Sequence, residues 1–294
     1  MISVSQLDSW TSAGAQTAAK NTYAAVEAAL AAWPALQSRD YKVFLQGSYA
    51  NSTNIRGDSD VDVVAMIRET FNSDTSALSS TQLNEYRADT TSATYTSADF
   101  RKDVTDALAS YFGWGRIEPK SKCIRVEKRD GYVDADVVPA AQHRLYTGHA
   151  GVLGLNYIEG IAIYPRGGSR IINYPKQHIQ NGSAKNQQTH EKFKPTVRLF
   201  KNMENAAVQR GLLREGVGPG YFVECLMYNC PDATFEGGAI DRDIAVLRSL
   251  IGADLAAFMA VDGIHTLFGT DPGGWETSAV SQLVDAWLNV LDDG

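Results

Sequence analysis

The segment GSYANSTNIRGDSDVDVV, which spans residues 47–64, decides the fold and the chemistry that we expect of this chain. Near its end, two carboxylates, Asp60 and Asp62, open an apolar run typical of a buried strand. Side chains two residues apart on a strand point to the same face of a sheet, so both carboxylates share one face and Val61 turns to the other. Two such charges repel each other unless a cation lies between them. The segment therefore predicts a cation site at the start of a strand.

The beginning of the same segment predicts a phosphate contact. Gly47 lets the backbone approach a phosphate closely, and the hydroxyl of Ser48 and neighbouring N–H groups can donate to it. Oxygen ligands suit Mg²⁺, which commonly binds one or two protein carboxylates together with substrate phosphates. We therefore expect Mg²⁺ as the cofactor, with Mn²⁺ as an alternative. A calcium loop starting at Asp58 is excluded, because its sixth position is Val63, where such loops have glycine.

A site with two metal ions needs a third carboxylate, and the segment VDADVVP at residues 133–139 supplies two candidates. Asp134 and Asp136 share one face of the expected strand, so either side chain can reach the first pair. We favour Asp136, because the apolar Val137 and Val138 directly after it indicate a position deeper in the sheet. Asp134 is then peripheral or solvated.

Apolar periodicity predicts a sheet lobe followed by a helical lobe. The predicted helices cover residues 5–33, 100–112, 193–210, 219–229, 240–260 and 276–291. The predicted strands cover residues 41–45, 61–67, 124–127, 132–138, 155–164 and 170–174, with a hairpin turn at 129–131. Residues 73–97 have weak periodicity and are expected to form a loop or an irregular helix. This order indicates an α+β fold. In this prediction, residues 1–175 form a sheet core that includes the long N-terminal helix, and residues 176–294 form a helical lobe. Residues 173–194 are the crossover between them.

Composition and charge narrow the class of protein. Of the 294 residues, 44% are hydrophobic and 21% are charged, which is ordinary for a globular chain. No apolar run approaches the ~20 residues that a membrane span needs, and the first residues, MISVSQLDSW, lack a basic flank and an apolar core, so we expect a cytoplasmic protein without a membrane segment. The net charge of −7 argues against a protein that coats duplex DNA, because phosphate neutralisation needs clustered Lys and Arg. The three cysteines, which form neither a disulfide framework nor a zinc pattern and are expected to be buried thiols, are Cys123, Cys225 and Cys230.

Four segments carry a resemblance to a known family. They are the opening segment at 47–64, ADVVP at 135–139, INYPKQHIQNGSAKNQQT at 172–189 and FKPTVRLFKN at 193–202. On these residues the chain resembles the cGAS/DncV-like nucleotidyltransferases (CD-NTases) of the polymerase-β-like superfamily, most of all their CdnE-type bacterial branch, over nearly its whole length. The resemblance implies synthesis of cyclic di- or trinucleotide second messengers in antiphage signalling. It also implies a long N-terminal helix that spans a nucleotidyltransferase sheet, followed by a C-terminal helical lobe.

The resemblance further implies roles for individual residues. Asp60, Asp62 and Asp136 would bind two Mg²⁺ ions, and six residues would bind nucleotide: Gly47, Ser48, Asn173, Lys185, Lys201 and Tyr221. Lys201 would hold phosphates, and Tyr221 would stack on a base; the alternatives are a solvated lysine and a core aromatic ring. Related enzymes often have serine directly before that tyrosine, whereas this chain has Gly220. A hydroxyl contact to phosphate is then lost or is replaced by a backbone N–H group.

Two positions bear on the choice and enclosure of the substrate. Asn173 precedes Tyr174 and a proline, and its amide can both donate and accept, as reading a pyrimidine edge requires. In the branch that the chain resembles, asparagine at the matching place is associated with uridine nucleotides; the alternative is a turn residue. Lys185 lies in a basic, amide-rich crossover that either covers the triphosphate or is a solvated connection.

The reaction expected from these residues is attack of a ribose hydroxyl on an α-phosphate with release of pyrophosphate, performed twice to close a ring. The expected substrates are UTP with ATP or CTP, and the expected product is a uridine-containing cyclic dinucleotide. We expect a monomer that binds no DNA and forms no stable complex with the effector that its product activates. Three alternatives stay open. They are transfer of a nucleotide to an RNA end, an antibiotic or a protein, a catalytically inactive nucleotide-binding sensor, and a purely structural interaction module, which the dense placement of aspartates disfavours. Retention of the three carboxylates and Ser48 argues against the inactive sensor.

Overall fold

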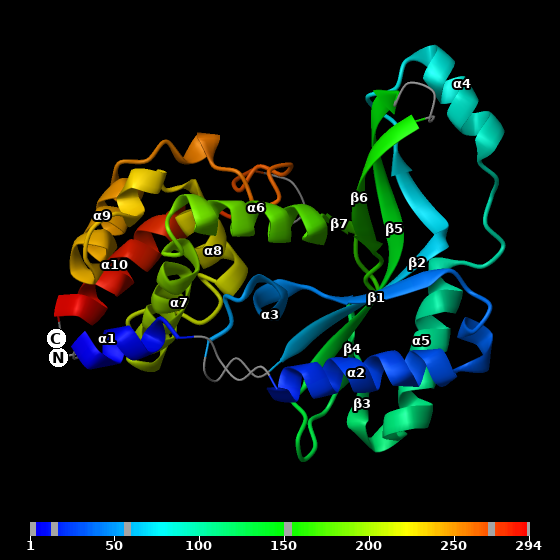
Figure 1. Cartoon of the computed structure of the whole chain (residues 1–294), viewed down its shortest axis with the longest axis horizontal. Coiled ribbons are helices and arrows are strands. Elements are labelled where there is room, and N and C mark those ends of the chain that lie inside the picture. Colours follow the sequence, from blue (N-terminus) through cyan, green and yellow to red (C-terminus); the bar gives the residue numbers. More distant parts are fainter. Residues whose placement is uncertain (1–3, 13–16, 56–59, 150–154, 270–273, 293–294) are drawn as a thin grey trace. The chain divides into compact units, whose positions relative to one another are not determined.

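The computed structural model describes residues 4–12, 17–55, 60–149, 155–269 and 274–292 (Figure 1). Contacts within the chain divide it into two compact units. We call the first the helical unit, and its parts are Met1–Ala15, Gly47–Asp58 and Gln177–Gly294. The second is the sheet unit, made of Gln16–Gln46 and Ser59–Lys176. The division into domains over residues 1–175 and 176–294 stays a prediction.

The sheet unit contains a mixed sheet that has seven strands within the described residues. The strands are β1 Tyr41–Leu45, β2 Val61–Asp74, β3 Ile117–Pro119, β4 Ile124–Val126, β5 Ala135–His149, β6 Leu155–Ile163 and β7 Ile171–Asn173. Their order is β1-β2-β5-β4-β3, β6 pairs with the later part of β5, and β7 pairs with β6. Strands β2 and β5 run parallel, and the other pairs are antiparallel. The predicted pairing of β4 with β5 across the 129–131 turn is confirmed.

The two faces of β2 differ in what they bury. Val64 and Met66, which alternate with Asp62, belong to an apolar cluster that also contains Val138 and Ile161 of neighbouring strands. The residues between them, such as Val63, point to the opposite face and are completely buried. The face that begins with Asp62 therefore continues into a dry core, which fixes the register of the strand.

Two helices contact the sheet and each other, α2 Thr17–Ala32 and α5 Ser97–Phe112 (Figure 1). Helix α5 begins in a capping box, in which Thr96 Oγ1 accepts the Asp99 N–H (3.2 Å) and Asp99 Oδ2 accepts the Thr96 N–H (2.9 Å). A further helix, α4 Ser80–Asp89, packs by Tyr86 against Tyr146 of β5, with ring centroids 5.3 Å apart. The region 73–97, expected to be a loop or an irregular helix, thus contains a regular helix.

The single N-terminal helix predicted over residues 5–33 is wrong in one respect, because the structure has two helices there. Helix α1, Val4–Trp10, ends in a turn in which Thr11 and Ser12 donate N–H groups to carbonyls three residues earlier. Helix α2 starts at Thr17. Thr11 and Ser12, which follow Trp10, favour a turn over a helix, since serine and threonine side chains compete for backbone groups.

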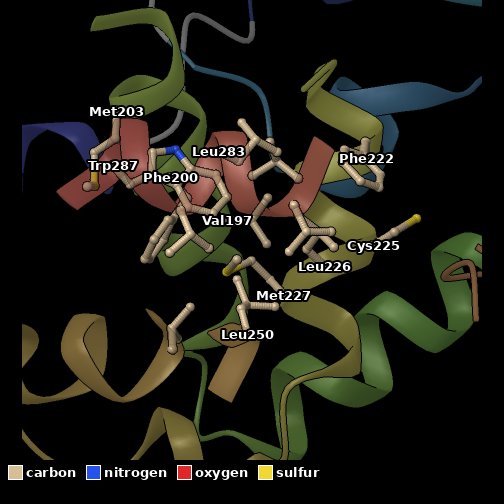
Figure 2. Packing of buried hydrophobic residues seen from close by; sticks show 14 of the residues in the cluster. Val197, Phe200, Met203, Phe222, Cys225, Leu226, Met227, Leu250, Leu283 and Trp287 are labelled. Atoms are coloured by element: carbon tan, nitrogen blue, oxygen red, sulfur yellow. The ribbon is translucent and has the colours of Figure 1, made fainter. Parts of the chain in front are cut away.

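The helical unit packs around one large apolar core (Figure 2). Its helices are α1, α3 Gly47–Asn51, α6 Pro175–Gln188 (whose first two residues fall in the sheet unit), α7 Phe193–Gln209, α8 Gly220–Asn229, α9 Ala239–Ile251 and α10 Ser278–Asp292. Phe200 of α7 meets Trp287 of α10 edge to face, with ring centroids 4.8 Å apart. The four predicted helices are confirmed, although α9 ends at Ile251 rather than near residue 260.

Helix α6 was not predicted, because its sequence is polar and was interpreted as a crossover. Its first residue is Pro175, which suits the first turn of a helix because proline has no N–H and a fixed φ. The α+β class is confirmed. Among the described residues, no helix is long and apolar enough to cross a membrane.

Candidate active site

The carboxylates predicted to bind metal lie at the start of two neighbouring parallel strands. Asp62 of β2 is the register partner of Asp136 of β5. Asp60 directly precedes β2, and the alternation of the strand places it on the same face as Asp62. The carbonyl of Asp62 also accepts the N–H of Gln46 (3.0 Å), so the chain leaves β1 beside this position. The sheet thus brings the carboxylates of two distant segments to one edge.

A guanidinium group that the sequence did not single out lies among these carboxylates. Arg125 of β4 is the register partner of Asp136. Its Nη1 and Nη2 donate to Asp60 Oδ2 (2.7 Å) and Oδ1 (3.2 Å), and Nη2 also lies 3.1 Å from Asp134 Oδ2. The hydrogen bonds to Asp60, together with the neighbouring charges, raise the pKa of Arg125 above its ordinary value. The guanidinium of Arg125 therefore pairs with three carboxylates.

Asp134 and Asp136 differ in how their oxygens are used. Asp134 Oδ1 accepts the backbone N–H of Lys128 (2.6 Å), which fixes the hairpin before β5. Asp136 Oδ1 is buried and accepts no hydrogen bond from any described residue, and Arg125 Nη1 lies 3.7 Å away. An unsatisfied buried carboxylate oxygen is costly unless a cation meets it. This difference favours Asp136 over Asp134 as the third ligand.

The residues at this edge fit a divalent cation. Asp60, Asp62, Asp134 and Asp136 together carry more negative charge than Arg125 neutralises, and their oxygens are the ligands that Mg²⁺ prefers. Asp60 keeps 40% of its side chain exposed. In the part of the chain that the structure describes, however, no three acidic, histidine or cysteine side chains surround a common point. The guanidinium of Arg125 lies between these carboxylates instead.

The cysteines behave as expected from the sequence. Cys123, Cys225 and Cys230 are all buried and free of disulfides. Burial, with the charge and hydrogen bond of Asp136, raises the pKa of the Cys123 thiol to about 11. A thiol of this kind is protonated at neutral pH, so it is a packing residue and not a nucleophile.

The Gly47-Ser48 segment opens the short helix α3 of the helical unit. Gly47 has φ of +67°, the left-handed region in which side chains are disfavoured. Its carbonyl accepts the side-chain amide of Asn51 (2.8 Å), and the carbonyl of Ser48 accepts the N–H of Thr53 (2.9 Å). The backbone at Ser48 is therefore held in one conformation by its own segment.

A buried polar network within the helical unit surrounds Glu224 of α8. Its Oε2 accepts from Thr53 Oγ1 (3.0 Å), and its Oε1 lies 2.9 Å from His178 Nε2 of α6. Lys201 Nζ of α7 donates to the Thr53 carbonyl (3.2 Å) and lies 3.9 Å from Glu224 Oε2. Burial alone would raise the pKa of Glu224, but His178 and Lys201 outweigh it and hold the pKa below its ordinary value. We call Thr53, His178, Lys201 and Glu224 the Glu224 network.

The other predicted nucleotide-binding residues of the helical unit are placed differently. Lys185 is buried, donates to the Cys230 carbonyl (2.6 Å) and pairs with Asp232 (2.6 Å), so its amine is engaged inside the unit. Tyr221 is 37% exposed and packs against the rings of His178 and Trp275. An aromatic ring that is held by neighbouring rings and partly open to solvent is suited to stacking on a base.

Asn173 ends β7 on the sheet unit and is exposed. It pairs with Ile161 of β6, which pairs with Gln142 of β5. Gln142 lies roughly 20 Å along the strand from Asp136, at about 3.3 Å per residue. Asn173 is therefore far from the carboxylates, and a ligand that met both would have to run along the sheet.

Sequence reasoning missed two charged residues of these sites. Arg125 lies between the buried Ile124 and Val126, and a lone cation inside a short apolar strand signals a buried partner. Glu224 lies in the apolar helix sequence GYFVECLMYN, which gives the same signal for an acid. Neither signal names the partner, because the partner comes from another segment of the chain.

Comparison with known proteins decides the family. The C-terminal helical domain of the cGAS/DncV-like nucleotidyltransferases matches residues 180–292. The cyclic UMP-AMP synthase of Rhodothermus marinus is 39% identical over 98% of this chain and 96% of its own length. The chain belongs to the CD-NTase family.

Further relatives of this CD-NTase agree in fold and reaction class. The cyclic dipyrimidine nucleotide synthase CdnE of Legionella pneumophila is 34% identical over 92% of this chain and 91% of its own length. The solved structure of Rhodothermus marinus CdnE c-UMP-AMP synthase with Apcpp and Upnpp matches with a TM-score of 0.88 and 37% identity, covering 100% of this chain and 97% of that one. This CD-NTase is therefore a nucleotidyltransferase, a class of enzyme that uses divalent metal ions.

Gly220, at which related enzymes often have serine, lies against the side chain of Lys201. A Cβ atom at this position would lie 3.2 Å from Cε and 3.4 Å from Nζ of Lys201. Glycine therefore leaves room for the lysine to reach Thr53 and Glu224. A serine here would require a small shift of the lysine end, which is flexible.

Proposed function

We propose that this CD-NTase joins two nucleoside triphosphates, at least one of them UTP, into a cyclic dinucleotide. One structural observation carries the proposal: Asp62 and Asp136 are register partners on parallel strands, with Asp60 beside them and one buried carboxylate oxygen left without a hydrogen bond. The relatives named above, a cyclic UMP-AMP synthase and a cyclic dipyrimidine synthase, support the uridine-containing product. As in the family that it belongs to, the product would act in bacterial antiphage signalling.

In this proposal Asp60, Asp62 and Asp136 hold Mg²⁺, with Mn²⁺ as a substitute. Bound divalent ions lower the pKa of an attacking hydroxyl and neutralise charge on the triphosphate. The oxygen of that hydroxyl forms a bond to the α-phosphorus, the bond to the β-phosphate oxygen breaks, and pyrophosphate leaves. Asp136 would accept the proton, a role supported by its Oδ1, which accepts no hydrogen bond from the described residues. The same step on the linear intermediate closes the ring.

The nucleotide-binding roles divide by exposure. Ser48 and Tyr221, each partly exposed, would meet phosphate and base directly, with Gly47 setting the turn. Lys201 and Lys185 are buried with protein partners, so a phosphate contact would require them to exchange those partners. Asn173, exposed at the end of β7, would read the uracil edge. ATP or CTP would supply the second base.

Product analysis tests this function. The protein is incubated with each pair of nucleoside triphosphates and Mg²⁺ or Mn²⁺, and phosphatase-resistant products are identified by mass spectrometry. We expect a cyclic dinucleotide that contains uridine. If the nucleotide is instead found attached to RNA, an antibiotic or a protein, the enzyme catalyses another nucleotidyl transfer. If no substrate releases pyrophosphate, the protein is a nucleotide-binding sensor.

A further inference from the structure

The position of Arg125 has a consequence for metal binding. Its guanidinium donates two hydrogen bonds to the two oxygens of Asp60, so it covers both oxygens of one predicted ligand. It also pairs with Asp134 (3.1 Å) and approaches Asp136 (3.7 Å). These are charge-assisted, fork-shaped contacts, the strongest class of hydrogen bond between side chains. Only 22% of the Arg125 side chain is exposed, so solvent screens these contacts weakly.

The register of the sheet builds Arg125 into this place. Strand β4 pairs with β5 so that Arg125 stands opposite Asp136, between two completely or almost completely buried neighbours, Ile124 and Val126. The apolar neighbours fix the strand, and the side chain must then lie on the carboxylate face. Arg125 therefore reaches Asp60 without any rearrangement of the backbone.

Arg125 donates to both oxygens of Asp60, so a divalent cation bound to the same carboxylate would have to share its lone pairs with, and be repelled by, a positive charge a few ångströms away. We call the start of β2 and β5, with Asp60, Asp62, Asp134 and Asp136, the carboxylate edge. We infer that Arg125 is an internal counter-ion of the carboxylate edge: it neutralises Asp60 in the metal-free protein and leaves Asp60 when a divalent ion binds. This inference rests on the proposed metal site, although its test requires no catalysis. A metal ion must displace Arg125 before it binds Asp60. The apparent affinity for the ion therefore equals the affinity of carboxylates without Arg125 multiplied by the fraction of protein in which Arg125 has left them.

Two properties of the protein follow. Before an ion binds, Arg125 limits the repulsion among the carboxylates and so stabilises the metal-free fold. After an ion binds, the guanidinium is released beside a site that receives a polyanion. Replacing Arg125 by methionine keeps most of the length of the side chain and removes its charge. This change should therefore tighten metal binding and lower the free energy of unfolding of the metal-free protein.

The test is a Mn²⁺ titration without nucleotide, in which electron paramagnetic resonance measures free Mn²⁺. We expect Arg125→Met to bind Mn²⁺ about tenfold more tightly than the wild type, which equals ~1.4 kcal/mol. We also expect Mn²⁺ to raise the thermal midpoint of the variant more than that of the wild type. The matched control is Arg39→Met, which breaks another arginine–carboxylate pair of the sheet unit, that with Glu69 (3.0 Å), and should leave Mn²⁺ affinity unchanged.

Equal or weaker Mn²⁺ binding by a folded Arg125→Met protein would overturn the role of Arg125 and leave the metal site intact. Absence of Mn²⁺ binding in both wild type and variant would overturn the metal assignment as well. If the methionine variant does not fold, Arg125→Lys keeps the charge and loses the fork. It should still bind Mn²⁺ severalfold more tightly than the wild type, and unchanged affinity would contradict the inference. In the wild type, Mg²⁺ should shift the Nε–H resonance of Arg125, and a resonance that stays fixed at saturating Mg²⁺ would also contradict it.

Discussion

The carboxylate edge of the sheet unit and the Glu224 network of the helical unit both place acids against cations, but with opposite charge balance. At the edge, Asp60, Asp134 and Asp136 share one arginine, Arg125, and the Asp60 side chain is 40% exposed. In the network, a single carboxylate that is 3% exposed meets His178, Lys201 and the Thr53 hydroxyl. The first group carries excess negative charge near solvent. In the second group, the acid is buried and each of its oxygens has a partner.

This difference predicts a binding role for the aspartates at the edge of the sheet and a structural role for the Glu224 network. A charge excess near solvent costs stability and is relieved by a ligand of opposite sign, whereas a matched buried group stabilises only when every partner is present. Loss of an acid should therefore abolish activity and spare the fold at the edge, and should weaken the fold in the network.

The largest effect is expected from Asp62→Asn or Asp60→Asn. Product formation should fall at least roughly 1,000-fold, which is ~4 kcal/mol of transition-state stabilisation, because a metal ligand is lost. The thermal midpoint should stay the same or rise, since one of several repelling charges is removed. Product yield is measured by mass spectrometry and unfolding by circular dichroism. Near-native yield from either variant would remove these residues from the metal site.

Asp134→Asn and Asp136→Asn should differ although the residues are two positions apart. Asp136→Asn should reduce product formation as severely as the Asp62 variant. Asp134→Asn should reduce it little and cost about 1 kcal/mol of stability, because the hydrogen bond from the Lys128 N–H loses its charged acceptor. Parallel product assays and denaturant titrations distinguish the two, and the reverse pattern would make Asp134 the third ligand.

In the Glu224 network, Glu224→Gln should lower the free energy of unfolding by about 1–3 kcal/mol, since buried charged partners lose a matched acceptor. The control is Glu215→Gln, an exposed position of the same unit, which should change stability by less than about 0.5 kcal/mol. Equal stability of the two variants would show that the network is not structural.

The network also predicts a pH dependence with a defined sign. The folded pKa of Glu224 is lowered from 4.5, so its contribution to stability is complete above that pH and is lost as the pH falls through the lowered folded value. The stability difference between wild type and Glu224→Gln should therefore shrink below about pH 4.5. A difference that grows on acidification would contradict the pKa direction.

The smallest effect is expected at Asn173, which belongs to neither region. Asn173→Ser should leave total nucleotide incorporation intact and lower uridine incorporation relative to purine about tenfold, equal to ~1.4 kcal/mol. Competing triphosphates in one reaction measure the ratio, so that a general loss of activity is not mistaken for altered choice. An unchanged ratio would return Asn173 to the role of a turn residue.

Local patterns in the sequence predicted the strands and the site edge well. The alternation around Asp60 and Asp62 predicted their shared face from strand periodicity, and the need of a two-metal site for a third carboxylate predicted Asp136 beside them. The apolar helices of the C-terminal region were found for the same reason. Helix α6 was missed since its sequence is polar, and the break after Trp10 was missed because alanine-rich flanks masked the turn residues.

What the sequence did not predict are the partners of Arg125 and Glu224, which come from distant segments. Arg125 lies more than 60 positions from Asp60, and Glu224 lies 171 positions from Thr53. Each charged residue signals that it needs a partner, but sheet register and helix packing choose which one. The same limit applies to Lys201, whose partners inside the helical unit were not visible in its own segment.

Manganese anomalous diffraction can show whether Asp60, Asp62 and Asp136 bind the metal ions. Crystals of the full chain are grown with Mn²⁺ and a non-hydrolysable UTP analogue, and data are collected at the manganese absorption edge. We expect anomalous peaks bound by oxygens of Asp60, Asp62 and Asp136, with Arg125 withdrawn from Asp60. Peaks held by other residues, or a bound nucleotide with no manganese at this edge of the sheet, would contradict it.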